Sequence, residues 1–343
     1  MKLENIKRIL IIRTDRIGDV VLSTPTITAT RKAFPKAYIA VMVSPVTLDI
    51  IEGNPNIDEV ISYDKHEGLL GDIKFILMLK KKRFDLALIL HSTSRINVLS
   101  FLAGIPNRVG YERGKLDLLL TKGVTYEKKL GKKHESEYSL DLLESLGVSV
   151  KKEPLLVPIN KRSEDDIRNL LEKEGVREGE RLIILHPGAS SYSKMWPKEN
   201  FAKVGDILAK DLHAKIVLIS GPEQVTIGEE VDHLMKEDVV FLCGKTRLDE
   251  LAPLFKRASL FISNDSGPVH IASSVDCPVI AIFSRNEPGL SPERWMPLNK
   301  KSSFIHKDSG CSICLAHECK KDFLCLRSIT VEEVVKKSEE LLK

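Results

Sequence analysis

The chain has 343 residues, of which 43% are hydrophobic and 29% are charged, and its formal net charge is +4. This length favours two domains, each able to bury a core of its own. The small net charge argues against a nucleic-acid binder, and no run of about 20 apolar residues predicts a membrane span. Because the first eight residues lead directly into an apolar strand, we expect no signal peptide and a cytoplasmic location.

The first half alternates short apolar strands with helical patterns. The strands are predicted at Arg8–Arg13, Tyr38–Val43, Glu59–Tyr63 and Leu86–Leu90. Pro25 lies inside the first helical pattern, so either the main helix begins at Thr24-Pro25 or the first turn is a separate helix. Repeated strand–helix alternation predicts a parallel, doubly wound sheet.

A linker is predicted between the two halves. Lys151–Asn160 contains proline and has no strong periodicity, and Ser163 is expected to cap the charged helix that follows. We therefore predict one domain over residues 1–160 and a second over residues 161–343.

The second half repeats the pattern of the first. Its first strands are predicted at Leu182–Leu185, Lys215–Ile219 and Val239–Leu242. Residues 285–307 are predicted to be irregular, and an amphipathic helix is expected at residues 331–342. Two domains of this kind are expected to bring the carboxyl ends of their strands to a shared cleft, where ligands bind.

The stretch Ser259–Ser284 reads as strand, turn, helix and strand. Its turn ends at Gly267, where the missing side chain lets a ligand approach the backbone. Asp265 or Ser266 can cap the helix, and Pro268 is near its first position. The helix N-terminus predicts an anion site, although similar turns occur in α/β proteins that bind nothing there.

Five motifs, in this order, resemble the ADP-heptose:lipopolysaccharide heptosyltransferases of glycosyltransferase family 9. They are RTDRIGDVVLSTP at Arg13–Pro25, HPGAS at His186–Ser190, SKMWP at Ser193–Pro197, GPE at Gly221–Glu223 and NDSGPVHIA at Asn264–Ala272. The resemblance implies a GT-B fold, with two Rossmann-like domains around a cleft. It also implies that the N-terminal domain binds the acceptor and the C-terminal domain binds the nucleotide sugar.

The same resemblance implies an inverting transfer of heptose from ADP-heptose to a lipopolysaccharide-core lipid, with no cofactor and no catalytic metal. Such an enzyme would work at the cytoplasmic surface of the inner membrane. The alternatives are another sugar donor or acceptor, a nucleotide-sugar epimerase of the same fold, or a catalytically silent binding module. A Rossmann dehydrogenase is disfavoured because the first turn lacks G-x-G-x-x-G.

Asp19 matches the carboxylate that acts as general base in the family, and an inverting transfer needs a base for the acceptor hydroxyl. Its structural alternative is an N-cap of the first helix. Asp15 is a second carboxylate nearby, and pairing with Arg13 or Arg16 is its simpler role.

The resemblance also implies which residues bind the nucleotide-sugar donor. Lys194 matches the lysine that contacts the donor phosphates, where a cation stabilises a departing diphosphate. Glu223 matches an acidic position facing the nucleotide sugar, although it can equally be a first-turn helix acid. Asp265 matches an acid near the donor sugar. The remaining candidates for the phosphates are Ser190, Ser191, Ser266, Gly267 and His270.

Two further clusters lie outside these motifs. Cys311, Cys314, Cys319 and Cys325 could bind a structural zinc ion, form a labile disulfide or remain free thiols. We expect this segment to be structural, because it is distant in sequence from every cleft motif. The basic runs Lys80–Arg83 and Lys128–Lys133 are solvated surface or contact an anionic lipid surface.

Overall fold

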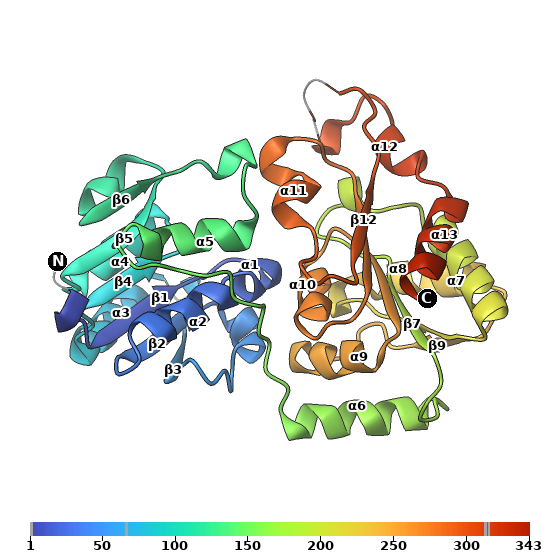
Figure 1. The fold of residues 1–343 in the computed structure, drawn as a ribbon, viewed down its shortest axis with the longest axis horizontal. Helices are drawn as coiled ribbons and strands as arrows, with labels where there is room; N and C mark the ends of the chain where they lie inside the picture. The colour runs from blue at the N-terminus through green and yellow to red at the C-terminus, as the bar shows by residue number, and fades with distance from the viewer. Residues whose placement is uncertain (1–2, 66–67, 312–313, 315) are drawn as a thin grey trace. The chain divides into compact units, whose positions relative to one another are not determined.

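The computed structural model describes residues 3–65, 68–311, 314 and 316–343. The chain divides into two compact units, residues 1–158 and residues 159–343, beside the predicted boundary (Figure 1).

The first unit is built on a six-stranded parallel sheet with the order β3-β2-β1-β4-β5-β6. Its strands are β1 (Arg8–Ile12), β2 (Tyr38–Val43), β3 (Glu59–Ser62), β4 (Leu86–Ile89), β5 (Asn107–Glu112) and β6 (Lys122–Thr125). The last two were not predicted, because they contain few apolar residues; β6 is an edge strand, and β5 lies between β4 and β6. The predicted doubly wound sheet is confirmed.

The helices of the first unit follow their strands. They are α1 (Ile17–Val21), α2 (Thr24–Ala33), α3 (Gly68–Lys82), α4 (Ser94–Leu102) and α5 (Glu135–Glu144). Pro25 is the second residue of α2, where its missing N–H group needs no partner. Both alternatives that Pro25 left open hold, because the main helix begins at Thr24 and the first turn is a separate helix, α1.

The second unit has the same strand order in space. Its sheet runs β12-β11-β10-β7-β8-β9, with all strands parallel. The strands are β7 (Leu182–His186), β8 (Lys215–Leu218), β9 (Val239–Phe241), β10 (Leu260–Asn264), β11 (Val279–Phe283) and β12 (Ser303–His306). The prediction of an irregular stretch over residues 285–307 was wrong, since β12 pairs with β11 there.

The helices of the second unit are α6 (Lys161–Lys173), α7 (Lys198–Leu212), α8 (Val225–Leu234), α9 (Leu251–Arg257), α10 (Gly267–Ser274), α11 (Pro292–Trp295), α12 (Leu324–Arg327) and α13 (Val331–Leu341). Asn160, not Ser163, caps α6: its side chain accepts from the Ser163 N–H at 2.8 Å. Among the described residues, no helix is both long and apolar enough to cross a membrane.

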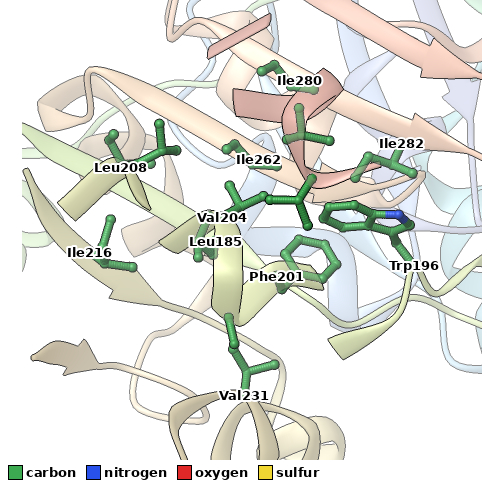
Figure 2. Close-up of a cluster of buried hydrophobic side chains, with 14 of the residues drawn as sticks. Leu185, Trp196, Phe201, Val204, Leu208, Ile216, Val231, Ile262, Ile280 and Ile282 are labelled. Atoms are coloured by element: carbon green, nitrogen blue, oxygen red, sulfur yellow. The ribbon is translucent and has the colours of Figure 1, made fainter. Parts of the chain in front are cut away.

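The core of the second unit lies between its sheet and the helices α7 and α13 (Figure 2). Trp196 is buried there and packs edge-on against Phe201, with 5.2 Å between ring centroids. The Trp196 indole N–H donates to the carbonyl of Ile329 at 3.0 Å. This anchor fixes the end of the loop that follows β7, so the polar residues of that loop are held in place.

Candidate active site

The predicted site residues gather at corresponding places in the two units. In each sheet the strand order reverses next to the first strand of the unit, between β1 and β4 and between β7 and β10. Ligands of open α/β sheets bind at this switch point, outside the carboxyl ends of the strands. Arg13 follows β1, and the loop carrying Lys194 follows β7.

Arg13 organises the site of the first unit. It is 3% exposed, and its guanidinium contacts three carboxylates from two distant segments. Nε donates to Asp15 at 2.8 Å, one terminal nitrogen donates to Asp19, and both terminal nitrogens lie 3.2 Å from Oε1 of Glu135. The planar fork of arginine suits such multiple contacts, so Arg13 fixes the position of Asp19.

A second cation completes this network. The ammonium of Lys128 lies 2.6 Å from Glu135 and 4.7 Å from the centre of the Tyr111 ring. Lys128 is only 3% exposed, and Lys133 pairs with Asp141 at 2.7 Å. The predicted role of the whole run 128–133 at a lipid surface is therefore wrong for Lys128, because a buried ion pair cannot reach a membrane.

Asp19 is a titratable carboxylate in this network. Burial raises its pKa to about 6; Arg13 opposes the rise, while Asp15 and Glu135 add to it. The N-cap alternative is wrong, because Asp19 lies inside α1 and the cap position is Arg16. A carboxylate with a pKa near neutrality is suited to accept a proton.

His91 was missed by the sequence analysis. It follows β4, and its backbone N–H donates to the Ile12 carbonyl at 3.3 Å. Its ring Nδ1 lies 3.3 Å from the Thr14 hydroxyl. Burial, with help from Arg13, lowers its pKa to about 4, so the imidazole is neutral near pH 7. The available signal was its place directly after the predicted strand Leu86–Leu90.

In the second unit, Lys194 forms an ion pair with Asp265. Lys194 comes from the short helix at Tyr192–Lys194 after β7, and Asp265 follows β10. The Lys194 side chain is 15% exposed and the Asp265 side chain is 14% exposed. The two residues matched to the donor pocket thus lie together, and a bound diphosphate would compete with Asp265 for Lys194.

The turn before α10 is held by hydrogen bonds between side chains. Nδ1 of His186 lies 3.0 Å from the Ser263 hydroxyl and 3.4 Å from the Ser266 hydroxyl. Ser266 occupies the N-cap position of α10, but its hydroxyl makes no capping bond to the helix. The helix begins at Gly267, one residue before the predicted start near Pro268, so the Gly267 backbone stands at the positive end of the helix dipole.

The other residues predicted to bind the donor phosphates differ in their exposure to solvent. Ser190 is exposed, whereas the Ser191 hydroxyl accepts from the Ser193 N–H at 3.2 Å. His270 is 2% exposed within α10. Arg285, after β11, was missed: its guanidinium lies 3.4 Å from the Ser193 hydroxyl, and its buried Nε has no hydrogen-bond partner among the described residues. Arg285 therefore adds a second cation beside the Lys194 loop.

Glu223 lies in the short helix Pro222–Gln224 and is exposed. The neighbouring Gln224 links this turn to the HPGAS loop, because its amide donates to the Ala189 carbonyl at 2.5 Å. A Cβ at Gly188 would meet the Gln224 side-chain oxygen, so a larger residue there would displace the Gln224 amide. The GPE and HPGAS motifs are thus joined in space.

The four clustered cysteines are free thiols. Burial, and then the nearby Cys319, raise the pKa of the Cys325 thiol. Within residues 3–65, 68–311, 314 and 316–343, no three His, Cys, Asp or Glu side chains are arranged to hold a metal ion. The segment does contact the Lys194 loop, since the Tyr192 hydroxyl donates to the His317 carbonyl at 2.6 Å. Distance in sequence was therefore misleading.

Comparisons with known proteins agree with this geometry. The family model "Glycosyltransferase family 9 (heptosyltransferase)" matches residues 73–324. Lipopolysaccharide heptosyltransferase 3 of Escherichia coli is 26% identical over 334 residues, 95% of each chain.

Two solved structures are similar over nearly the whole chain. A family 9 glycosyl transferase from Veillonella parvula has a TM-score of 0.86 at 26% identity and covers 98% of this chain and 97% of its own. The ADP-heptose lps heptosyltransferase II of E. coli has a TM-score of 0.80 at 22% identity, with 98% of each chain covered. The chain has the predicted GT-B fold, is a glycosyltransferase, and belongs to glycosyltransferase family 9, the heptosyltransferase family.

Proposed function

We propose that this enzyme transfers heptose from ADP-heptose to the inner core of lipopolysaccharide, on a Kdo–lipid A type of acceptor, with inversion at the anomeric carbon. The observation that carries this proposal is Asp19, a carboxylate with a pKa of about 6 at the switch point of the first unit. The names of its relatives, lipopolysaccharide heptosyltransferases among them, support the choice of donor and acceptor.

In the proposed reaction, the acceptor hydroxyl oxygen attacks the anomeric carbon of the heptose. Its proton passes to Asp19 as the new carbon–oxygen bond forms, and the bond to the β-phosphate breaks with the electron pair leaving on ADP. Arg13 holds the Asp19 carboxylate in place. The neutral His91 beside Thr14 is a further group able to orient the acceptor by hydrogen bonding.

The second unit is assigned to the donor. Charge builds on the diphosphate as it departs, so preorganised cations and N–H groups lower the barrier. Lys194, Arg285 and the first turn of α10 supply these groups. Asp265 then turns from Lys194 to the sugar hydroxyls, and Glu223 and Ser191 are placed on the same edge of the sheet to bind the rest of the donor.

We further propose that the enzyme works in the cytoplasm, peripheral to the inner membrane, because a lipid-linked acceptor resides there. No cofactor is required by this scheme. The basic run 80–83 supports contact with anionic lipid more than the run 128–133 does, since Lys128 is buried.

The experiment is a transfer assay on the full chain with ADP-heptose and Kdo–lipid A, in which ADP release and the anomeric configuration of the product are measured. We expect release that depends on both substrates and an inverted product. UDP- and GDP-sugars serve as matched donors. Transfer from one of these alone would replace ADP-heptose as donor, and donor conversion without acceptor would favour the epimerase.

A further inference from the structure

The helix α3 is apolar on two opposite sides. Phe75, Ile76 and Met78 pack against the core of the first sheet, and Leu79 is buried in it. On the outer side, Leu69 is 82% exposed and Leu70 is 75% exposed. A helix that is apolar all round normally has a partner on both sides, and within the described residues of the first unit nothing covers the outer side of α3.

The outer side continues into a groove beside α4. Ile73 and Leu77, 53% and 54% exposed, follow Leu69 at helical spacing. Leu69 and Ile73 line a cavity of about 340 Å³ together with Leu102 of α4, which is 51% exposed. We call Leu69, Leu70, Ile73, Leu77 and Leu102 the α3 apolar face. Contiguous apolar surface of this kind marks an interaction site.

The charges around the α3 apolar face are of one sign. Lys74, Lys80 and Lys81 are exposed on the same helix. Asp72 is the only acidic residue in the sequence of α3, and it is held by the Arg95 guanidinium at 2.8 Å and the Tyr63 hydroxyl at 2.8 Å. The surface that α3 offers is thus aliphatic and cationic.

We infer that the α3 apolar face docks onto an anionic lipid bilayer, with its aliphatic side chains at the boundary of the acyl chains and the three lysines at the phosphates. Lysines can place their stems along apolar surface while the ammonium stays among headgroups. Helices with this composition lie in the membrane interface, and each nearby lysine adds attraction to anionic lipid.

The charge pattern also separates this occupant from a second copy of the chain. A symmetric dimer through the α3 apolar face would place the same lysines of both copies at one interface. Like charges brought together there would repel, whereas lipid phosphates neutralise them. The inference rests on the proposed function only in that a lipid acceptor gives the enzyme a reason to dock.

The first test measures flotation of the full chain with vesicles of phosphatidylglycerol and phosphatidylethanolamine, at low and high salt. Leu70→Gln with Leu77→Gln should weaken binding by about tenfold for each leucine, since burying one leucine is worth at least that factor. Lys74→Gln with Lys80→Gln and Lys81→Gln should weaken binding chiefly at low salt. Leu234→Gln, at an exposed leucine of the other unit, is the matched control and should bind normally.

The second test places a reporter on the face. Leu77→Trp should be quenched by brominated lipid in the same vesicles, and Leu234→Trp should not. Unchanged flotation of the double glutamine variant, or no quenching at position 77, would overturn the inference. So would a wild-type dimer that the glutamines dissociate without any loss of vesicle binding.

Turnover separates this inference from the proposed function. With a deacylated, water-dispersed acceptor the glutamine variants should keep the wild-type rate, which also shows that they are folded. Loss of vesicle binding with that rate intact supports docking through α3. Transfer that fails with every acceptor in the wild type would instead reject the proposed function and leave the lipid-binding result standing.

Discussion

The two units have the same strand order and place their polar residues at the same switch point, yet the charges there are opposite. The first unit gathers the carboxylates of Asp15, Asp19 and Glu135 around the buried Arg13. The second gathers Lys194, Arg285 and the N-terminus of α10, with Asp265 as the paired carboxylate. One topology therefore carries an excess of carboxylates in one unit and an excess of cations in the other, as the proposed proton acceptor and the proposed diphosphate site require.

The difference shows which part of the chain determines each role. The sheet determines where a side chain is presented, because the carboxyl ends of β1 and β7 are equivalent positions. The residues of the following loop determine what the position does. In the first unit three carboxylates face two cations, and the pKa of Asp19 is raised to about 6.

Replacing the base should produce the largest effect. Asp19→Asn keeps the size of the side chain but cannot take a proton as a carboxylate does, so turnover should fall by about 10²–10⁴. Donor affinity should be unchanged, because the donor is assigned to the other unit. Steady-state rates and calorimetric ADP binding on one sample test both points.

Asp15→Asn is the matched control for this change, since it removes another carboxylate from Arg13. It should cost far less activity. Near-normal turnover of Asp19→Asn would remove Asp19 from the mechanism, and a larger loss in Asp15→Asn would transfer the role to Asp15.

Removing the cation of the second unit should have the next largest effect. Lys194→Met keeps the aliphatic stem and removes the charge, so kcat should fall by about 10²–10³, the cost of losing one preorganised stabilising group. ADP binding should weaken as well, unlike in Asp19→Asn. Lys198→Met, at a half-exposed lysine paired with Glu230, is the control. Normal ADP binding by Lys194→Met would contradict the assignment of the diphosphate to this unit.

The pH profile offers a smaller, graded test of the first unit. The base must be ionised, so kcat/KM should decline as the pH falls through about 6, the pKa of Asp19. Glu135 is one cause of that raised pKa, and Glu135→Gln removes its charge. The acidic limb should then move down by about one pH unit, leaving the rate at pH 8 little changed. An unmoved limb would show that another group controls it.

Much of this arrangement could be predicted from the sequence, and the exceptions have physical reasons. Most of the strands that were predicted correctly are apolar runs buried on both faces, such as Ile9–Ile12. The strands β5 and β6 were missed because each contains only one or two apolar residues among polar ones, Val109 and Tyr111 in β5 and Val124 in β6. Sequence distance also concealed Glu135, which reaches Arg13 across 122 positions.

The donor side shows the same limit. Asp265 and Lys194 were both predicted as site residues, but their ion pair depends on two loops meeting. Arg285 follows a predicted strand and carries no motif, so only its contact with Ser193 reveals it. Local patterns therefore located the loops, and the tertiary structure was needed to show which side chains in them face one another.

The smallest expected effect concerns the cysteine-rich segment, residues 311–325. The sequence of the first unit contains no cysteine and so no counterpart of this segment. The Tyr192 hydroxyl donates to the His317 carbonyl at 2.6 Å, and the Tyr192 ring packs edge-on against Phe323 at 5.5 Å. Tyr192 begins the short helix that ends at Lys194. Tyr192→Phe keeps the ring contact and loses one neutral hydrogen bond at a residue that is 55% exposed.

Such a bond is worth about 0.5–1.5 kcal/mol at most here, so the KM for the donor should rise by about threefold with kcat nearly unchanged. Tyr192→Ala also removes the ring, and should raise the KM further. Glu199→Gln, at an exposed residue just after this loop, is the control. If both tyrosine variants bind the donor as the wild type does, the cysteine-rich segment has no part in holding Lys194, and its contacts serve stability alone.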